Sequence, residues 1–213
     1  MIYCKPPTLS FISRGLSIGR PCISLSFLGS NSDPTTALPS QNSLSIREIA
    51  SQLTSLYNPT CEEVSLGGGE PLLQVDALQT LATHLKKPLH LYTNGTLTNQ
   101  LIETRTLFTT ITIIYTPHFD DELTATLSSL IGQKNIVMIY PLERQFNRLE
   151  YTKLVSLLST LIPDIPFIIE PIIPFSGNKN TAKSEDIMGA YSLAKSKLKD
   201  IYIRPNTDTF INL

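Results

Sequence analysis

Short apolar runs of strand character alternate along the chain with longer segments whose apolar residues recur at helical spacing. Seven runs are predicted to be strands: Cys22–Leu28, Glu63–Leu66, Leu89–Tyr92, Ile111–Tyr115, Asn135–Tyr140, Phe167–Ile172 and Ile201–Arg204. This alternation is typical of βαβ units that build a parallel sheet. Because the runs are almost continuously apolar, we expect both strand faces to be buried and the helices to cover the outside of the sheet.

Five segments between these runs are predicted to be helices: Ser45–Tyr57, Val75–Leu85, Asp120–Ile131, Asn147–Leu161 and Lys183–Lys197. The first begins with a capping box, Ser45-x-x-Glu48, in which each residue can satisfy a free amide of the other. Strands and helices together predict an α/β fold, a partial (βα)6 TIM-like barrel formed by one domain over residues 1–213. In such folds the active site lies at the carboxyl ends of the strands.

Composition narrows the classes of partner and compartment. The chain of 213 residues is 41% hydrophobic, enough for a core, but only 16% charged with a formal net charge of −1. With no excess of basic residues, nucleic acid is not an expected partner. The three cysteines are odd in number and widely spaced, which favours a reducing, cytoplasmic location. Neither a membrane helix of about 20 apolar residues nor a signal peptide is expected, so no membrane partner is predicted.

Two polar turns follow neighbouring predicted strands at the expected active-site edge. They are Gly67-Gly68-Gly69-Glu70-Pro71 and Thr93-Asn94-Gly95. Glycines let the backbone approach a ligand closely, and Glu70 would aim a carboxylate into the barrel mouth. Both turns also have a structural interpretation, a tight strand-to-helix connection and an ordinary Asn-Gly turn. The candidate binding residues are therefore Gly68, Gly69, Glu70, Thr93 and Asn94, with both interpretations open.

Four segments in this order carry a family resemblance over most of the chain: Gly15-Leu16-Ser17-Ile18-Gly19-Arg20-Pro21, Phe27-Leu28-Gly29, Gly68-Gly69-Glu70-Pro71-Leu72-Leu73-Gln74 and Thr93-Asn94-Gly95-Thr96. The chain resembles the radical S-adenosylmethionine superfamily, and within it the 7-carboxy-7-deazaguanine synthases. The resemblance implies a barrel of the radical S-adenosylmethionine type in which Gly68, Gly69 and Glu70 hold the methionine amine of S-adenosylmethionine. It further implies that Thr93 and Asn94 lie near the ribose, that the ligand is a small nucleoside or purine-like molecule, and that the protein is a homodimer.

The cluster motif of that family is missing. Most members bind a [4Fe–4S] cluster through three cysteines spaced CxxxCxxC, the first of which should follow Gly29, but the sequence has no cysteine between Cys22 and Cys61. Ser30 cannot take the place of a cysteine, because iron–sulfur clusters need soft thiolate ligands. We therefore expect no [4Fe–4S] cluster and no metal, with S-adenosylmethionine as the remaining candidate cofactor. Residues 31–40 are expected to form a loop over the barrel mouth instead of the cluster loop.

Substrate recognition also departs from the family pattern. Ile12-Ser13-Arg14-Gly15 stands where the family has Gln-Gly-Glu-Gly, Ser26 where it has arginine, and Asp208-Thr209 where it ends in His-Lys. A guanidinium in place of a carboxylate reverses the charge offered to a ligand. These departures imply a degenerate relative that has lost the cluster and the radical reaction and is retained as a binding or scaffolding protein. The alternative is a divergent active enzyme that acts on a deazapurine or nucleoside.

Other candidate constellations are weaker. The histidines, His84, His90 and His118, fall on a helix, a strand and a strand end without metal-ligand spacing, so we interpret them as ordinary polar residues. The acidic groups Glu62-Glu63 and Asp120-Asp121-Glu122 are interpreted as solvated or helix-start charges. No G-x-S-x-G elbow lies between a predicted strand and a predicted helix, so no nucleophile is marked out. Hydrolytic and metal-dependent chemistry are therefore not predicted.

Overall fold

A computed structural model describes residues 1–11, 20–29, 31, 43–57, 59–117, 120–133, 135–143, 146–171 and 182–204. Its main sheet has eight strands in the order β10-β9-β8-β7-β6-β5-β3-β2. In chain order these are β2 (Thr8–Phe11), β3 (Pro21–Phe27), β5 (Glu63–Gly68), β6 (Leu89–Thr93), β7 (Thr110–Ile114), β8 (Ile136–Leu142), β9 (Phe167–Pro171) and β10 (Ile201–Ile203). All neighbouring pairs from β3 to β10 are parallel, whereas β2 joins the edge of β3 in the antiparallel sense.

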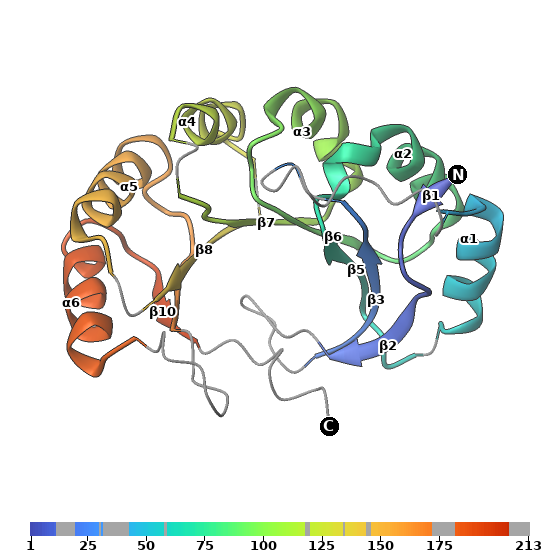
Figure 1. Ribbon diagram of the computed structural model, residues 1–213, viewed down its shortest axis with the longest axis horizontal. Helices are drawn as coiled ribbons and strands as arrows, with labels where there is room; N and C mark the ends of the chain where they lie inside the picture. The colour runs from blue at the N-terminus through green and yellow to red at the C-terminus, as the bar shows by residue number, and fades with distance from the viewer. Residues whose placement is uncertain are drawn as a thin grey trace.

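Helices cover the convex side of this curved sheet, from α1 at one end of the arch to α6 at the other (Figure 1). They are α1 (Ile46–Ser55), α2 (Val75–His84), α3 (Thr98–Thr104), α4 (Asp120–Ser129), α5 (Arg148–Leu161) and α6 (Ser184–Lys195), with short 3-10 helices at η2 (Pro71–Gln74) and η3 (Arg105–Leu107). The predicted capping box is present, since Ser45 and Glu48 each accept the other's backbone N–H. The arrangement confirms the predicted α/β class and the partial barrel.

Three features were not predicted from the sequence: the antiparallel strand β2, helix α3, and a two-stranded sheet of β1 (Ile2–Tyr3) with β4 (Ser43–Leu44). The strands β1 and β4 are two residues long, too short to show a period. Helix α3 has seven residues, no side-chain cap and one buried apolar residue, Leu101. Such elements depend on tertiary packing rather than on a pattern in the sequence.

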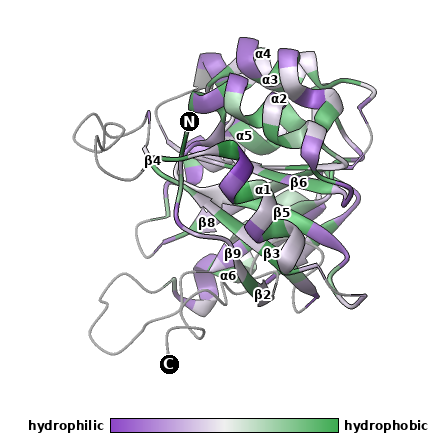
Figure 2. Cartoon of the chain, turned by 90° about the vertical axis from the view of Figure 1, so that its right-hand side faces the viewer, coloured by the Kyte–Doolittle hydropathy of each residue, from purple (hydrophilic) through white to green (hydrophobic). Residues whose placement is uncertain are grey.

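The core lies between the sheet and the helices. Outward-facing strand residues such as Leu66, Leu91 and Met138 are fully buried against the helices, while hydrophilic residues colour the outer helix surfaces (Figure 2). The concave face differs along the sheet, because β3 and β5 place half-buried serines there, whereas Ile139 and Ile168 make a small apolar cluster on β8 and β9. The expectation that every strand is buried on both faces is therefore wrong for β3 and β5.

Several expectations fall outside the described residues. They concern residues 12–19, 32–40 and 206–209, together with Ser30 and His118. In the described part of the chain, no helix combines the length and the apolar character needed to cross a membrane.

Candidate functional site

The glycine turn after β5 is pressed against the end of β3. The backbone N–H of Gly69 donates to the carbonyl oxygen of Phe27, and that of Glu70 to the carbonyl oxygen of Gly29, both at 2.9 Å. A Cβ at Gly69 would lie 2.0 Å from the Gly29 oxygen, and Gly68 has a φ of +93° with no room for a Cβ beside Phe27. Both glycines are therefore required by the close approach of two backbone segments.

Glu70 is 3% exposed, and both oxygens of its carboxylate accept hydrogen bonds from nearby groups of the protein. Oε1 accepts from the backbone N–H of Leu72 at 3.1 Å, and Oε2 from that of Asn94 at 2.9 Å. The hydroxyl of Thr93 lies 2.9 Å from both oxygens. Burial raises the pKa of the Glu70 carboxyl, although the Asn94 and Leu72 amides and the Thr93 hydroxyl oppose this shift. The carboxylate thus caps η2 and joins it to the end of β6.

The turn after β6 is closed by a second set of hydrogen bonds. The Asn94 Oδ1 accepts from the backbone N–H and the hydroxyl of Thr96, at 3.1 and 2.7 Å. Its Nδ2 donates to Oδ1 of Asn31 at 2.8 Å, and the Asn31 amide in turn donates to the Thr96 hydroxyl. Asn31, where the loop expected over the barrel mouth begins, therefore lies at the predicted edge of the sheet.

The structure brings all five candidate residues together, since Gly68, Gly69 and Glu70 belong to one turn, Thr93 and Asn94 to its neighbour, and Glu70 contacts the second turn directly. A ligand amine would have to enter this buried contact, where three donors already bond to the Glu70 carboxylate. Sequence reasoning did not assign roles to Asn31 and Gln74. Gln74 is 8% exposed, and its side-chain amide pairs with the backbone N–H and carbonyl of Tyr3 at 2.8 and 3.0 Å.

The predictions for the titratable residues outside this edge agree with the structure at some positions and not at others. Helix α4 begins at Asp120, as the helix-start interpretation expects. Glu63 is not a solvated charge, and that prediction is wrong: its carboxylate lies 2.8 Å from Nδ1 of His90 with only 17% of its side chain exposed. The register of β5 and β6 places both residues on the concave face, which the sequence alone does not reveal. His84 ends α2 on the surface, as expected of an ordinary polar residue.

The cysteines do not fit a [4Fe–4S] cluster. Cys22 and Cys61 lie at the amino ends of β3 and β5, at the edge of the sheet opposite the glycine turn. The backbone of Cys4 pairs with that of Phe27 in an isolated β-bridge, and Phe27 lies roughly 16 Å from Cys22 along β3 at the usual rise per residue. All three are at most 2% exposed, and burial raises the pKa of Cys4 to about 11 and of Cys22 to about 12. A cluster needs three thiolates that converge on one group.

A partial barrel with a Gly-Gly-Glu turn after one strand and a Thr-Asn-Gly turn after the next, both at the carboxyl edge, defines the class: the chain has the fold of the radical S-adenosylmethionine superfamily. Residues 32–139 match the model of the family described as "4Fe-4S single cluster domain", and the chain belongs to that family.

Solved structures share the fold at low identity. A radical SAM methyltransferase from Sphaerobacter thermophilus aligns with a TM-score of 0.69 at 15% identity, covering 96% of this chain and 70% of that one. QueE from Escherichia coli aligns with a TM-score of 0.62 at 14% identity over 95% and 93% of the two chains. TYW1 with a lysine-pyruvate adduct bound gives 0.56 at 11% identity over 83% and 74%. No curated protein sequence matches this chain.

Proposed function

We propose that this protein is a member of the radical S-adenosylmethionine superfamily that has lost the [4Fe–4S] cluster and the radical reaction and serves as a binding or scaffolding protein. The observation that carries the proposal is the position of the cysteines: two lie at the amino ends of the strands, and the third belongs to the buried core. A cluster at the glycine turn would require thiolates at the carboxyl edge of the sheet, the edge opposite Cys22 and Cys61.

The hydrogen bonds around Glu70 support the same proposal. Thr93 and the backbone amides of Leu72 and Asn94 use both oxygens of the carboxylate, and Asn31 engages the amide of Asn94. Groups that would hold a nucleoside cofactor therefore stabilise the turns themselves. As expectations from the sequence, we further propose a cytoplasmic homodimer with a small nucleoside or purine-like ligand.

A second function is favoured by the match to a 4Fe-4S cluster family and by the retained Gly68-Gly69-Glu70 turn. In this alternative the protein is a divergent enzyme acting on a deazapurine or nucleoside, related to the 7-carboxy-7-deazaguanine synthases. Glu70 would then accept a hydrogen bond from a ligand amine in exchange for one of its present donors.

Anaerobic reconstitution with ferrous iron and sulfide tests the loss of the cluster. We expect the protein to remain colourless, with no stoichiometric iron and sulfide after gel filtration. About four irons per chain, lost in both Cys22→Ser and Cys61→Ser, would overturn the proposal. Iron that persists in both variants without stoichiometric sulfide is adventitious and leaves the proposal standing, whereas stoichiometric iron and sulfide in both variants would overturn it as well.

Calorimetry with S-adenosylmethionine and S-adenosylhomocysteine separates the two functions at the glycine turn. The proposal predicts that Glu70 takes no part in binding either compound and that Glu70→Gln is destabilised. Binding that Glu70→Gln weakens, while Glu62→Gln leaves it intact, would support the enzyme instead. Glu62 is a suitable control because its side chain is 58% exposed. Within the described residues, its carboxylate forms an ion pair with the exposed Arg20.

A further inference from the structure

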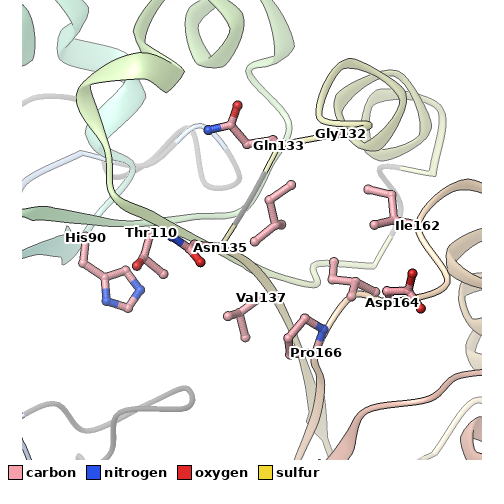
Figure 3. A pocket seen from close by; sticks show the side chains of 11 residues that line it. His90, Thr110, Gly132, Gln133, Asn135, Val137, Ile162, Asp164 and Pro166 are labelled. Carbon is pink, nitrogen blue, oxygen red and sulfur yellow. The ribbon is translucent and has the colours of Figure 1, made fainter.

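A cavity opens at the amino ends of β6 to β9, at the edge of the sheet opposite the glycine turns. Its volume is about 620 Å³, within the range of small-molecule sites in proteins. The eleven residues that line it come from the strand starts and from the connections that follow α4 and α5 (Figure 3). None of these residues belongs to the turns around Glu70, so the cavity is a separate feature of the fold.

The two sides of the cavity differ in character. Ile162, Ile165 and Pro166 provide an apolar side together with the first residues of β8. The polar side is formed by His90, Thr110, Gln133 and Asn135, and Figure 3 shows the first two on the side away from Ile162. The lining set, all of it within the described chain, contains no lysine or arginine. The described lining residues offer apolar surface and hydrogen-bonding side-chain amides, a combination that suits an uncharged polar ligand.

The one carboxylate in the lining lies on its rim. The side chain of Asp164 is 70% exposed and is paired with Lys199, itself 73% exposed. Because solvent screens this pair and each charge offsets the other, it adds little net potential inside the cavity.

His90 is fixed by contacts on both ring nitrogens. Nδ1 lies 2.8 Å from the carboxylate of Glu63, and Nε2 lies 2.8 Å from the hydroxyl of Thr112. Its ring also stacks on Tyr92, with 4.3 Å between centroids. The residue is only 4% exposed, so burying this polar network has a desolvation cost that an apolar side chain would avoid. A preorganised polar group beside a cavity is a frequent feature of ligand sites.

Asn135 provides a second unusual feature of the lining. It has a φ of 60°, the one positive value for a non-glycine residue in the described chain, and its Nδ2 donates to the carbonyl oxygen of Thr109. This bond directs the amide nitrogen toward the start of β7 and leaves Oδ1 as the acceptor of the side chain. The neighbouring Gln133, half-buried, carries a second side-chain amide at the cavity.

We propose that this cavity binds an uncharged heterocyclic amide or lactam. Its ring would pack against the side formed by Ile162, Ile165 and Pro166, and its adjacent donor and acceptor would pair with the side-chain amides of Gln133 and Asn135. Side-chain amides suit such an edge because they offer a donor and an acceptor side by side. His90, held by Glu63, positions the polar side of the cavity.

Calorimetry and ligand-observed NMR with hypoxanthine, nicotinamide and nicotinate test this proposal on the full chain. We expect hypoxanthine or nicotinamide to bind with a stoichiometry of one per chain, and nicotinate, the anionic counterpart of nicotinamide, to bind at least about tenfold more weakly. Gln133→Ala should lower the affinity about tenfold through the loss of a hydrogen-bonding amide. Ile165→Phe should abolish binding by filling the cavity.

Two controls keep the test independent of the proposed function. Leu149→Phe changes a residue that is 68% exposed and outside the lining, so it should leave the affinity unchanged. Glu70→Gln should also leave it unchanged, because Glu70 is not a lining residue. Absence of binding by both neutral probes would overturn the proposal, as would tighter binding of nicotinate or binding insensitive to Gln133→Ala. If Ile165→Phe fails to fold, Gln133→Ala decides the outcome.

Discussion

The two edges of the sheet use polar residues in opposite ways. At the carboxyl edge, Glu70 and Asn94 are occupied by neighbouring amides and hydroxyls, so the polar groups hold two turns together. At the amino edge, Gln133 and Asn135 line a cavity of about 620 Å³. A recognisable motif therefore shows where a site is expected in the fold, while the contacts of each polar atom decide whether a ligand can bind there.

The largest loss of stability is expected when a side chain is added at the glycine turn, where the backbone of β3 leaves no room for one. Gly69→Ala would place a Cβ 2.0 Å from the Gly29 oxygen, so the turn or β3 must move. We expect a loss of about 3 kcal/mol or more in the free energy of unfolding, measured by urea denaturation. Gly189→Ala is the matched control: nothing lies within 4 Å of its Cβ position in α6, and stability should rise by up to about 1 kcal/mol. Equal effects in both variants would contradict the described packing.

A smaller loss is expected from Glu70→Gln. Glutamine has one acceptor oxygen where the carboxylate has two, so either the Leu72 or the Asn94 amide loses its partner. The cost should be about 2 kcal/mol for an unsatisfied buried donor. Chemical denaturation of Glu70→Gln beside Glu62→Gln measures it. A change at Glu70 no larger than that at the exposed Glu62 would show that the carboxylate does not hold the turns together.

The same carboxyl predicts a pH dependence. Burial raises the Glu70 pKa above its ordinary value of 4.5, so the folded state binds this proton more tightly than the unfolded state. Stability from this group is complete below that value and is lost as pH rises through the folded-state pKa. We expect this decline in the native chain and its absence in Glu70→Gln, measured by urea midpoints from pH 4.5 upward. A decline of the same size in both would assign it to another group.

The smallest of the expected losses concerns the amino edge. His90→Leu removes the partner of Glu63 and of the Thr112 hydroxyl, and we expect a cost of about 1 to 2 kcal/mol. His84→Leu, at the exposed end of α2, should change stability by less than about 0.5 kcal/mol. Thermal denaturation of the two variants provides the comparison. If the double variant Glu63→Leu with His90→Leu loses as much as the two single losses added, the pair is not coupled.

Local features of the fold could be predicted from the sequence, and long-range contacts could not. The Ser45–Glu48 capping box lies within four consecutive residues, and the glycine turn follows directly from its strand. The pairing of Glu63 with His90 depends on the register between β5 and β6, and the contact of Asn31 with Asn94 spans 63 positions in the sequence. No periodicity or spacing encodes such a contact. The sequence therefore locates the candidate turns but does not show that their polar groups already bond to one another.

The Gln74 side chain has a mechanical consequence. Its amide bonds to both the backbone N–H and the carbonyl oxygen of Tyr3, across 71 positions in the sequence. The Tyr3 carbonyl oxygen also accepts from the backbone N–H of Leu28 at 2.9 Å, so a pull on the chain at Tyr3 would load η2 and the end of β3 together. Under tension, β1 and the glycine turn should yield together as one unit, so a force applied near the start of the chain would be transmitted to the edge where the superfamily places its cofactor.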